Sequence, residues 1–348
     1  MRMVPDGSVR RVNREEFSGT SQNIHRCGTY QTDTIGKGEI AMLSKRLQRI
    51  LSVLVVLALL AVFGASVSTG ASAASSAERE TNGIIAFLTD WGTRDFYVGA
   101  VKGVALSIFP EATLVDITHE VEPYNIMEGA VTLLLAAREY PAGTVFVAIV
   151  DPGVGTERRP IVLRTEDDKF FVGPDNGLFT FVAQEFGVKA VYQITNKDFM
   201  RPGPISFSFH GRDIFTPTAA RIAAGRKASD VGPAISDFVV LDVKPARLED
   251  GKLIGEVVLV DQYGNMQANI SRDLVAKLGL KFNDKVRVTV GDKTIESRFV
   301  NTYGDVPEGS DLIFVASTEW VEISVNMGSA KDRFGGDIGS QVIIEKAE

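Results

Sequence analysis

Residues 145–159 (Val-Phe-Val-Ala-Ile-Val-Asp-Pro-Gly-Val-Gly-Thr-Glu-Arg-Arg) constrain the fold of this chain more than any other stretch. The apolar, β-branched run at the start predicts a buried strand that ends at Asp151. The proline and glycines that follow predict a tight loop, along which Arg158 can fold back toward Asp151. Ligands of open α/β sheets bind beyond the carboxyl ends of the strands, so this loop is a candidate site. Taken alone, Asp151 is equally typical of a residue that caps its own turn.

The region from residue 83 to residue 238 alternates between strand and helix patterns. Apolar runs predict strands, and apolar residues at helical spacing predict helices; the strands are 84–88, 113–117 and 144–150, and the helices are 96–108 and 126–138. This order predicts an α/β domain with a doubly wound, mainly parallel sheet. Asp90, His119 and Asp151 then follow strand ends on one edge of the sheet. A lone histidine such as His119 is more often structural than catalytic.

A change of texture follows a predicted linker at residues 239–250. Residues 251–348 contain short strand patterns separated by turn residues, which predict a smaller antiparallel, β-barrel-like domain. Loop segments such as 261–265 and 301–305 are rich in Asp, Asn and Gly, and most residues of this kind form turns.

The front of the chain has the composition of a targeting segment. Residues 1–41 are polar without an apolar period, and we interpret them as an unstructured upstream extension with the true start at Met42. Residues 42–73 combine a basic stretch, an apolar run at 50–65 and Ala71-Ser-Ala73, which together predict a secretory signal peptide. The expected location is therefore periplasmic or extracellular. A retained membrane anchor is the alternative, although the run is short for one.

Charge and ligand counts exclude several classes of protein. The formal net charge of −7 argues against a nucleic-acid partner. One cysteine excludes an internal disulfide, and three histidines argue against a histidine-rich metal site. The phosphate-binding patterns G-x-x-x-x-G-K-[ST] and G-x-G-x-x-G are missing, so we expect no nucleotide cofactor held in this way.

Several motifs occur together in one order along residues 84–345. They are Leu88-Thr-Asp-Trp-Gly92 with Asp95 and Tyr97-Val-Gly99, Val115-Asp-Ile-Thr-His119, Asp151-Pro-Gly-Val-Gly155 with Arg158, Pro174-Asp-Asn-Gly177, His210-Gly-Arg-Asp213 and Asp261-Gln-Tyr-Gly-Asn265. With them the chain resembles the S-adenosyl-L-methionine (SAM) hydroxide adenosyltransferases, the adenosine-forming SAM hydrolases related to fluorinase and chlorinase.

The resemblance implies a role for each matching residue. The hydrolytic members of this family hold a water molecule with a set of Asp, Arg and His residues. The matching residues here are Asp151, Arg158 and His210. The implied substrate contacts are Asp90 to the ribose, Asp95, Asp261 and Ser317 to the methionine end, Asn265 and Tyr303 to adenine, and Tyr124 as an aromatic neighbour. The segment from Ser317 to Trp320 differs from the Asn-Ser-x-Gly-Tyr type that is usual in the family, and Val325 replaces an arginine found in the fluorinase. Arg159, beside Arg158, is interpreted as a surface charge.

The implied reaction is attack of water on ribose C5′ of SAM, which gives adenosine and L-methionine without a metal or cofactor. A positioned carboxylate or imidazole can take the proton of the water, and the sequence leaves open which of them does so. One alternative is a 5′-halogenase-like adenosyltransferase, although Asp151 stands where halogenases have tyrosine. Another is an exported protein that binds adenosine or SAM without turnover. The resemblance also implies a homotrimer with sites at subunit interfaces.

Overall fold

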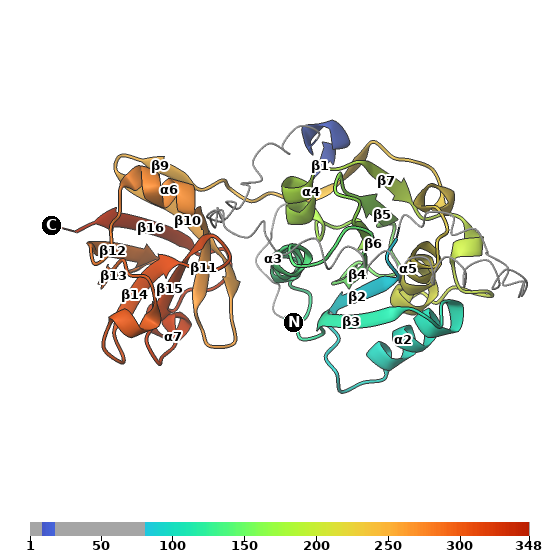
Figure 1. Cartoon of the computed structure of the whole chain (residues 1–348), viewed down its shortest axis with the longest axis horizontal. Coiled ribbons are helices and arrows are strands. Elements are labelled where there is room, and N and C mark those ends of the chain that lie inside the picture. Colours follow the sequence, from blue (N-terminus) through green and yellow to red (C-terminus); the bar gives the residue numbers. More distant parts are fainter. Residues whose placement is uncertain (1–8, 18–80, 348) are drawn as a thin grey trace, which may run out of the picture. The chain divides into compact units, whose positions relative to one another are not determined.

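The computed structural model describes residues 9–17 and 81–347 (Figure 1). The predicted signal segment 42–73 lies outside these residues. Within them, no helix combines the length and the apolar character that a membrane span requires.

The first domain is built on a six-stranded sheet in the order β3-β2-β4-β6-β5-β7. The strands are β2 (Ile84–Thr89), β3 (Thr113–Thr118), β4 (Val145–Ile149), β5 (Pro160–Arg164), β6 (Phe170–Pro174) and β7 (Ala190–Gln193). Strands β3, β2, β4 and β6 are parallel, whereas β5 pairs antiparallel with β6 and β7. The prediction of a mainly parallel α/β sheet is confirmed.

Helices cover both faces of this sheet. Helices α3 (Ile126–Ala137) and α4 (Thr180–Phe186) contribute to one apolar core, and α2 (Tyr97–Ile108) and α5 (Thr216–Ala223) contribute to the other (Figure 1). Strand β4 serves both cores, because successive side chains of a strand point to opposite faces. Phe146 belongs to the first core, Val145 and Val147 belong to the second, and all three are fully buried. An uninterrupted apolar run is therefore what a central strand of this kind requires.

The second domain is an antiparallel sheet in the order β13-β12-β16-β10-β11-β15-β14, with β9 beside β10. Its strands are β9 (Arg247–Glu249), β10 (Lys252–Val260), β11 (Met266–Ser271), β12 (Lys285–Val290), β13 (Lys293–Arg298), β14 (Asp311–Val315), β15 (Trp320–Val325) and β16 (Gln341–Lys346), with helices α6 (Arg272–Leu278) and α7 (Ala330–Phe334). A bridge between Phe299 and Ile313 brings the two ends of the sheet together, which gives the nearly closed, barrel-like form predicted.

Two predictions at the edges of the domains need correction. Residues 1–41 were expected to be unstructured, but residues 9–17 form strand β1 (Val9–Asn13) and a 3-10 turn, η1 (Arg14–Phe17). The error arose because only one residue of this short strand, Val12, is buried, which leaves no periodic apolar pattern. The predicted linker 239–250 is also too long. Strand β8 (Asp237–Leu241) pairs with β1, and β9 pairs with β10, so the connector is residues 242–246.

Candidate active site

The predicted site lies at the carboxyl edge of the parallel strands. Asp90 follows β2, His119 follows β3 and Asp151 lies just beyond β4, and these three strands run in the same direction. Burial raises the pKa of the Asp90 carboxyl, the backbone amide of Tyr124 lowers it again, and the nearby charge of Asp151 adds to the rise. A raised pKa is expected where two carboxylates share one edge, and a cationic ligand would relieve it.

Arg158 joins Asp151 to His210. Its Nε donates to Asp151 Oδ1 at 2.9 Å, and its Nη2 donates to Asp151 Oδ2 at 2.5 Å and to His210 Nδ1 at 2.9 Å. The side chains of Arg158 and Asp151 are only 9% and 6% exposed, and the guanidinium carbon lies 5.0 Å from the ring centre of Phe215. In the described part of the chain, Arg158 Nη1 is buried without a hydrogen-bond partner. The guanidinium therefore keeps one donor group that no acceptor among the described residues uses.

The contact with Arg158 fixes the tautomer of His210. A guanidinium can only donate, so Nδ1 of His210 must be the acceptor, and a neutral ring then carries its proton on Nε2. Burial lowers the pKa of His210, the positive charge of Arg158 lowers it further, and the charge of Asp151 opposes the change. At neutral pH the imidazole is therefore uncharged, with an N–H on the atom that does not face Arg158.

Two glycines allow the loops of the site to approach one another. Gly155 has a φ of +77°, and a Cβ atom there would lie 2.3 Å from the carbonyl oxygen of Phe207. Gly211 follows His210, and a Cβ atom there would lie 2.5 Å from the ring of Trp91. Neither approach is possible for a residue with a side chain. These positions bring His210 to Arg158, although 52 residues separate them along the chain.

The backbone after His210 forms an uncommon kind of turn. Residues Gly211–Phe215 form a single π-helical turn, η3, that runs directly into α5. A π turn inside a helix is frequent at functional sites, because it changes the direction of the side chains around it.

The Pro174-Asp-Asn-Gly177 motif supports the site from behind. Asn176 Nδ2 donates to the carbonyl of Val150 at 2.8 Å, which holds the end of β4 just before Asp151. Asp175 is buried, accepts a hydrogen bond from Val239 N at 2.7 Å and forms an ion pair with Arg159 at 2.7 Å. Arg159 also binds Asp237 at 3.1 Å. The interpretation of Arg159 as a surface charge is therefore wrong, because it links two carboxylates from other segments.

The loop after β2 has its own supports. The buried His119 contacts Thr89 Oγ1 through Nδ1 at 2.8 Å, and its carbonyl accepts from Gly92 N at 2.7 Å. These contacts fit a structural histidine. Asp90 Oδ2 accepts from Tyr124 N at 2.9 Å. Tyr124 is 63% exposed and has a φ of +68°, a strained conformation of the kind found at ligand sites. Asp95 is exposed in the loop before α2.

The second domain gathers three further predicted residues. Asp261 accepts from Asn265 Nδ2 at 2.9 Å, and Asn265 Nδ2 lies 3.5 Å from the hydroxyl of Tyr303, in the turn η5 (Tyr303–Asp305). Glu322 of β15, which was not predicted from the sequence, is 4% exposed and accepts hydrogen bonds from Tyr303 Oη at 2.5 Å and from Gln267 Nε2 at 3.1 Å. Burial raises the pKa of Tyr303, and its hydrogen bond to Glu322 raises it further. Glu322 could have been found from the sequence, because it is a charged residue within an otherwise mainly apolar strand pattern.

Ser317 does not join this cluster. It is exposed in the turn between β14 and β15, and the neighbouring Glu319 accepts from Arg272 N, which follows the far end of β11. Asp261 and Asn265 precede β11, so about 17 Å of strand separates the two ends at ~3.4 Å per residue. The segment beside Asp261 and Asn265 is instead 326–331, because Lys331 N donates to the carbonyl of Gly264 at 2.9 Å.

The protein is thus a two-domain α/β enzyme in which a carboxylate, a guanidinium and an imidazole meet at the edge of a parallel sheet. Models of the N-terminal and C-terminal domains of SAM hydroxide adenosyltransferase match residues 85–232 and 255–343. The chain belongs to the SAM hydroxide adenosyltransferase family, as the motifs predicted.

Named relatives lie on both branches of the family. The (R)-S-adenosyl-L-methionine hydrolase of Salinispora tropica is 40% identical over 261 residues, which cover 74% of this chain and 96% of that protein. A fluorinase from an Actinoplanes species is 29% identical over 294 residues, which cover 76% and 98%. The crystal structure of an uncharacterized conserved protein from Thermotoga maritima matches with a TM-score of 0.73 and 42% identity, covering 75% of this chain and 99% of that one.

Proposed function

We propose that the protein hydrolyses SAM to adenosine and L-methionine, with water attacking ribose C5′. The observation that carries the proposal is the contact of Arg158 with both Asp151 and His210. The loop after β4 supplies Asp151 and Arg158, and the segment before α5 supplies His210, which lies 52 residues from Arg158 along the chain. The identity to proteins named hydrolases supports the same reaction.

In the proposed reaction a C5′–O bond forms as the C5′–S bond breaks, and the sulfur keeps the electron pair of the broken bond. The sulfonium leaves as a neutral thioether, so neither an acid nor a cofactor is required. The water must lose a proton, and Asp151 is the acceptor that we propose. His210 faces Arg158 through Nδ1, so its Nε2–H is a donor that orients the water. Positioning and general-base help together lower the barrier.

The substrate contacts of the proposal divide between the two domains. Asp90 binds the ribose hydroxyls, Asp95 binds the methionine end, and Tyr124 covers the ligand. In the second domain, Asp261 binds the methionine end and Asn265 and Tyr303 bind adenine, as predicted from the sequence. Ser317 remains a predicted contact to the methionine end. It lies near the end of β11 that is far from Asp261, which argues against one shared site within a single chain.

We also propose a homo-oligomer, with a trimer as the expected form. Large apolar side chains stand exposed on both domains: Phe96 is 66%, Phe207 86%, Tyr263 69% and Met327 83% exposed. Aromatic residues and methionine are enriched at interfaces between proteins. A second copy that brings the two surfaces together would complete the site. A fully active protein with the mass of a monomer in native mass spectrometry would contradict this proposal.

The hydrolase proposal is tested by incubating the full chain with SAM in water labelled with heavy oxygen. We expect adenosine and methionine, with the label in the 5′-hydroxyl of adenosine. Unlabelled adenosine would exclude attack of water at C5′. Formation of 5′-halo-adenosine when chloride or fluoride is added would favour the halogenase reaction. Tight binding of SAM in calorimetry without any product would favour a binding protein.

A further inference from the structure

Strand β8 pairs with strand β1, which lies near the N-terminus of the chain. Residues Val9 to Asn13 pair antiparallel with β8, from Val9 opposite Leu241 to Asn13 opposite Asp237. Val12 is 2% exposed, whereas Val9 on the same strand is 51% exposed. Phe17, in the turn that follows, is buried with its ring centre 5.7 Å from that of Phe238. Val12 and Phe17 are therefore part of the apolar core of the first domain.

Polar contacts fix the same segment. Arg11 Nη1 donates to Asp237 Oδ2 at 3.0 Å and lies 3.5 Å from Asp175 Oδ2. Both carboxylates also bind Arg159, the neighbour of Arg158 in the sequence. Arg14 N donates to the carbonyl of Ser236 at 2.9 Å. Arg11 of this segment thus shares both of its carboxylate partners with Arg159, which lies in the loop of the proposed active site.

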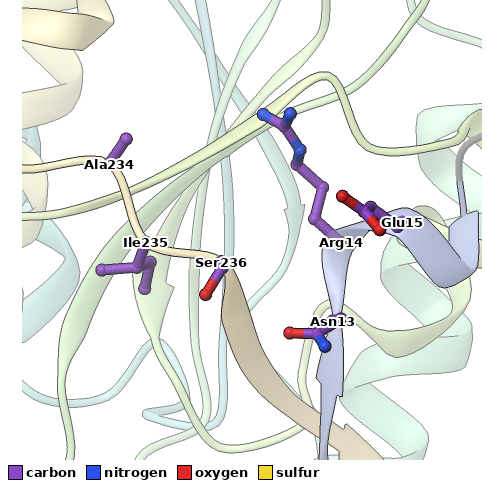
Figure 2. Close-up of a pocket in the computed structure, with 6 residues that line it drawn as sticks. All are labelled: Asn13, Arg14, Glu15, Ala234, Ile235 and Ser236. Atoms are coloured by element: carbon purple, nitrogen blue, oxygen red, sulfur yellow. The ribbon is translucent and has the colours of Figure 1, made fainter.

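A hollow lies where β1 passes into η1. Figure 2 shows Asn13, Arg14 and Glu15 on one side of it and residues 234–236 on the other. None of the predicted site residues lines this hollow, so we do not assign it to the substrate. Arg14 Nη1 extends to the carbonyl of Lys189 at 2.9 Å.

The pairing of β1 with β8 constrains the position of the chain relative to a membrane. Paired strands lie about 4.8 Å apart, whereas the apolar core of a bilayer is about 30 Å thick. If residues 50–65 were a retained anchor, residues 9–17 and the first domain would lie on opposite sides of the bilayer. If a signal peptide were cleaved after residue 73, residues 9–17 would be removed with it. Neither arrangement permits the observed strand pair.

We infer that the edge of β8 that pairs with β1 is the docking surface for residues 9–17 of this same chain. The working protein keeps this segment, in the same compartment as the first domain. Residues 50–65 then separate two parts of one folded domain. This inference and the export predicted from the sequence exclude each other.

A matched pair of variants on β1 tests the docking in the full chain. Val12→Asp places a carboxylate in the core, whereas Val9→Asp places the same group in solvent. We expect Val12→Asp to lower the melting temperature by about 4–10 °C and Val9→Asp to leave it unchanged. If Val12→Asp does not fold, Val12→Ala takes its place with a smaller decrease. Equal melting temperatures for the two positions would overturn the inference.

The compartment is tested by intact-mass analysis of the full chain, tagged at its C-terminus and isolated from fractionated cells. We expect the active protein to contain residues 9–17 and to be found with cytoplasmic markers. Active protein that begins near residue 74, or that is found in the periplasm or the medium, would refute the inference.

Discussion

Replacing Asp151 by Asn tests the proposed chemistry most directly, because the two side chains have nearly the same shape. Asp151 accepts hydrogen bonds from Arg158 through both carboxylate oxygens, at 2.9 Å through Oδ1 and at 2.5 Å through Oδ2, and its side chain is 6% exposed. The amide of Asn keeps one oxygen that accepts hydrogen bonds, and its NH₂ group would face a guanidinium donor. The amide carries no negative charge and cannot take a proton from water.

The expected loss has two separate parts. Removing a general base costs typically about 10²–10⁴-fold in rate, which corresponds to about 3–5 kcal/mol in the activation barrier. Breaking a buried ion pair costs up to about 3–5 kcal/mol in the free energy of unfolding. The affinity for SAM should change much less than kcat, because the lost interaction acts mainly in the transition state.

Asp175→Asn is the matched control. Asp175 is a carboxylate with a 1% exposed side chain and an arginine partner, Arg159, at 2.7 Å, but it lies outside the Asp151–Arg158–His210 set. Both variants should lower the free energy of unfolding measured in urea. Only Asp151→Asn should lower kcat, measured by chromatography of released adenosine and methionine. If both variants lost kcat equally, or if Asp151→Asn turned over at the parent rate, Asp151 would not be the base.

Three further predictions concern the supports of the site. Because the pKa of His210 is lowered, kcat/KM should fall on the acid side at a pH below the ordinary histidine value of 6.5. The free energy of unfolding should also decrease as the pH falls through this range, because the unfolded chain binds the proton first. A fall of kcat/KM centred above pH 6.5 would contradict the assignment. Gly155→Ala should cost about 1–3 kcal/mol of stability and lower kcat, whereas Gly203→Ala, also at positive φ but with open space around it, should cost less stability and leave kcat unchanged. Glu322→Gln should raise KM for SAM about ten- to hundredfold with little change in kcat, because Tyr303 loses its charged partner; an unchanged KM would remove Tyr303 from the binding site.

The order of the strands and the division into two domains could be predicted from local sequence patterns. Apolar runs and turn residues act over a few positions, so they predicted the strands before Asp90 and Asp151 and the edge at which these residues stand. The change to short strands after residue 251 predicted the second domain for the same reason. Motif order then indicated the family, because each motif is a short local segment.

Which side chains come into contact could be seen only in the folded protein. The contact of Arg158 with His210, the role of Arg159 between two carboxylates, and the burial of Glu322 depend on distances between segments far apart in the chain. The docking of residues 9–17 on β8 was equally invisible, because a strand with one buried residue has no period to detect. Local patterns record the preferences of neighbouring residues, whereas a site is defined by packing across the fold, and packing is settled only when all segments are in place.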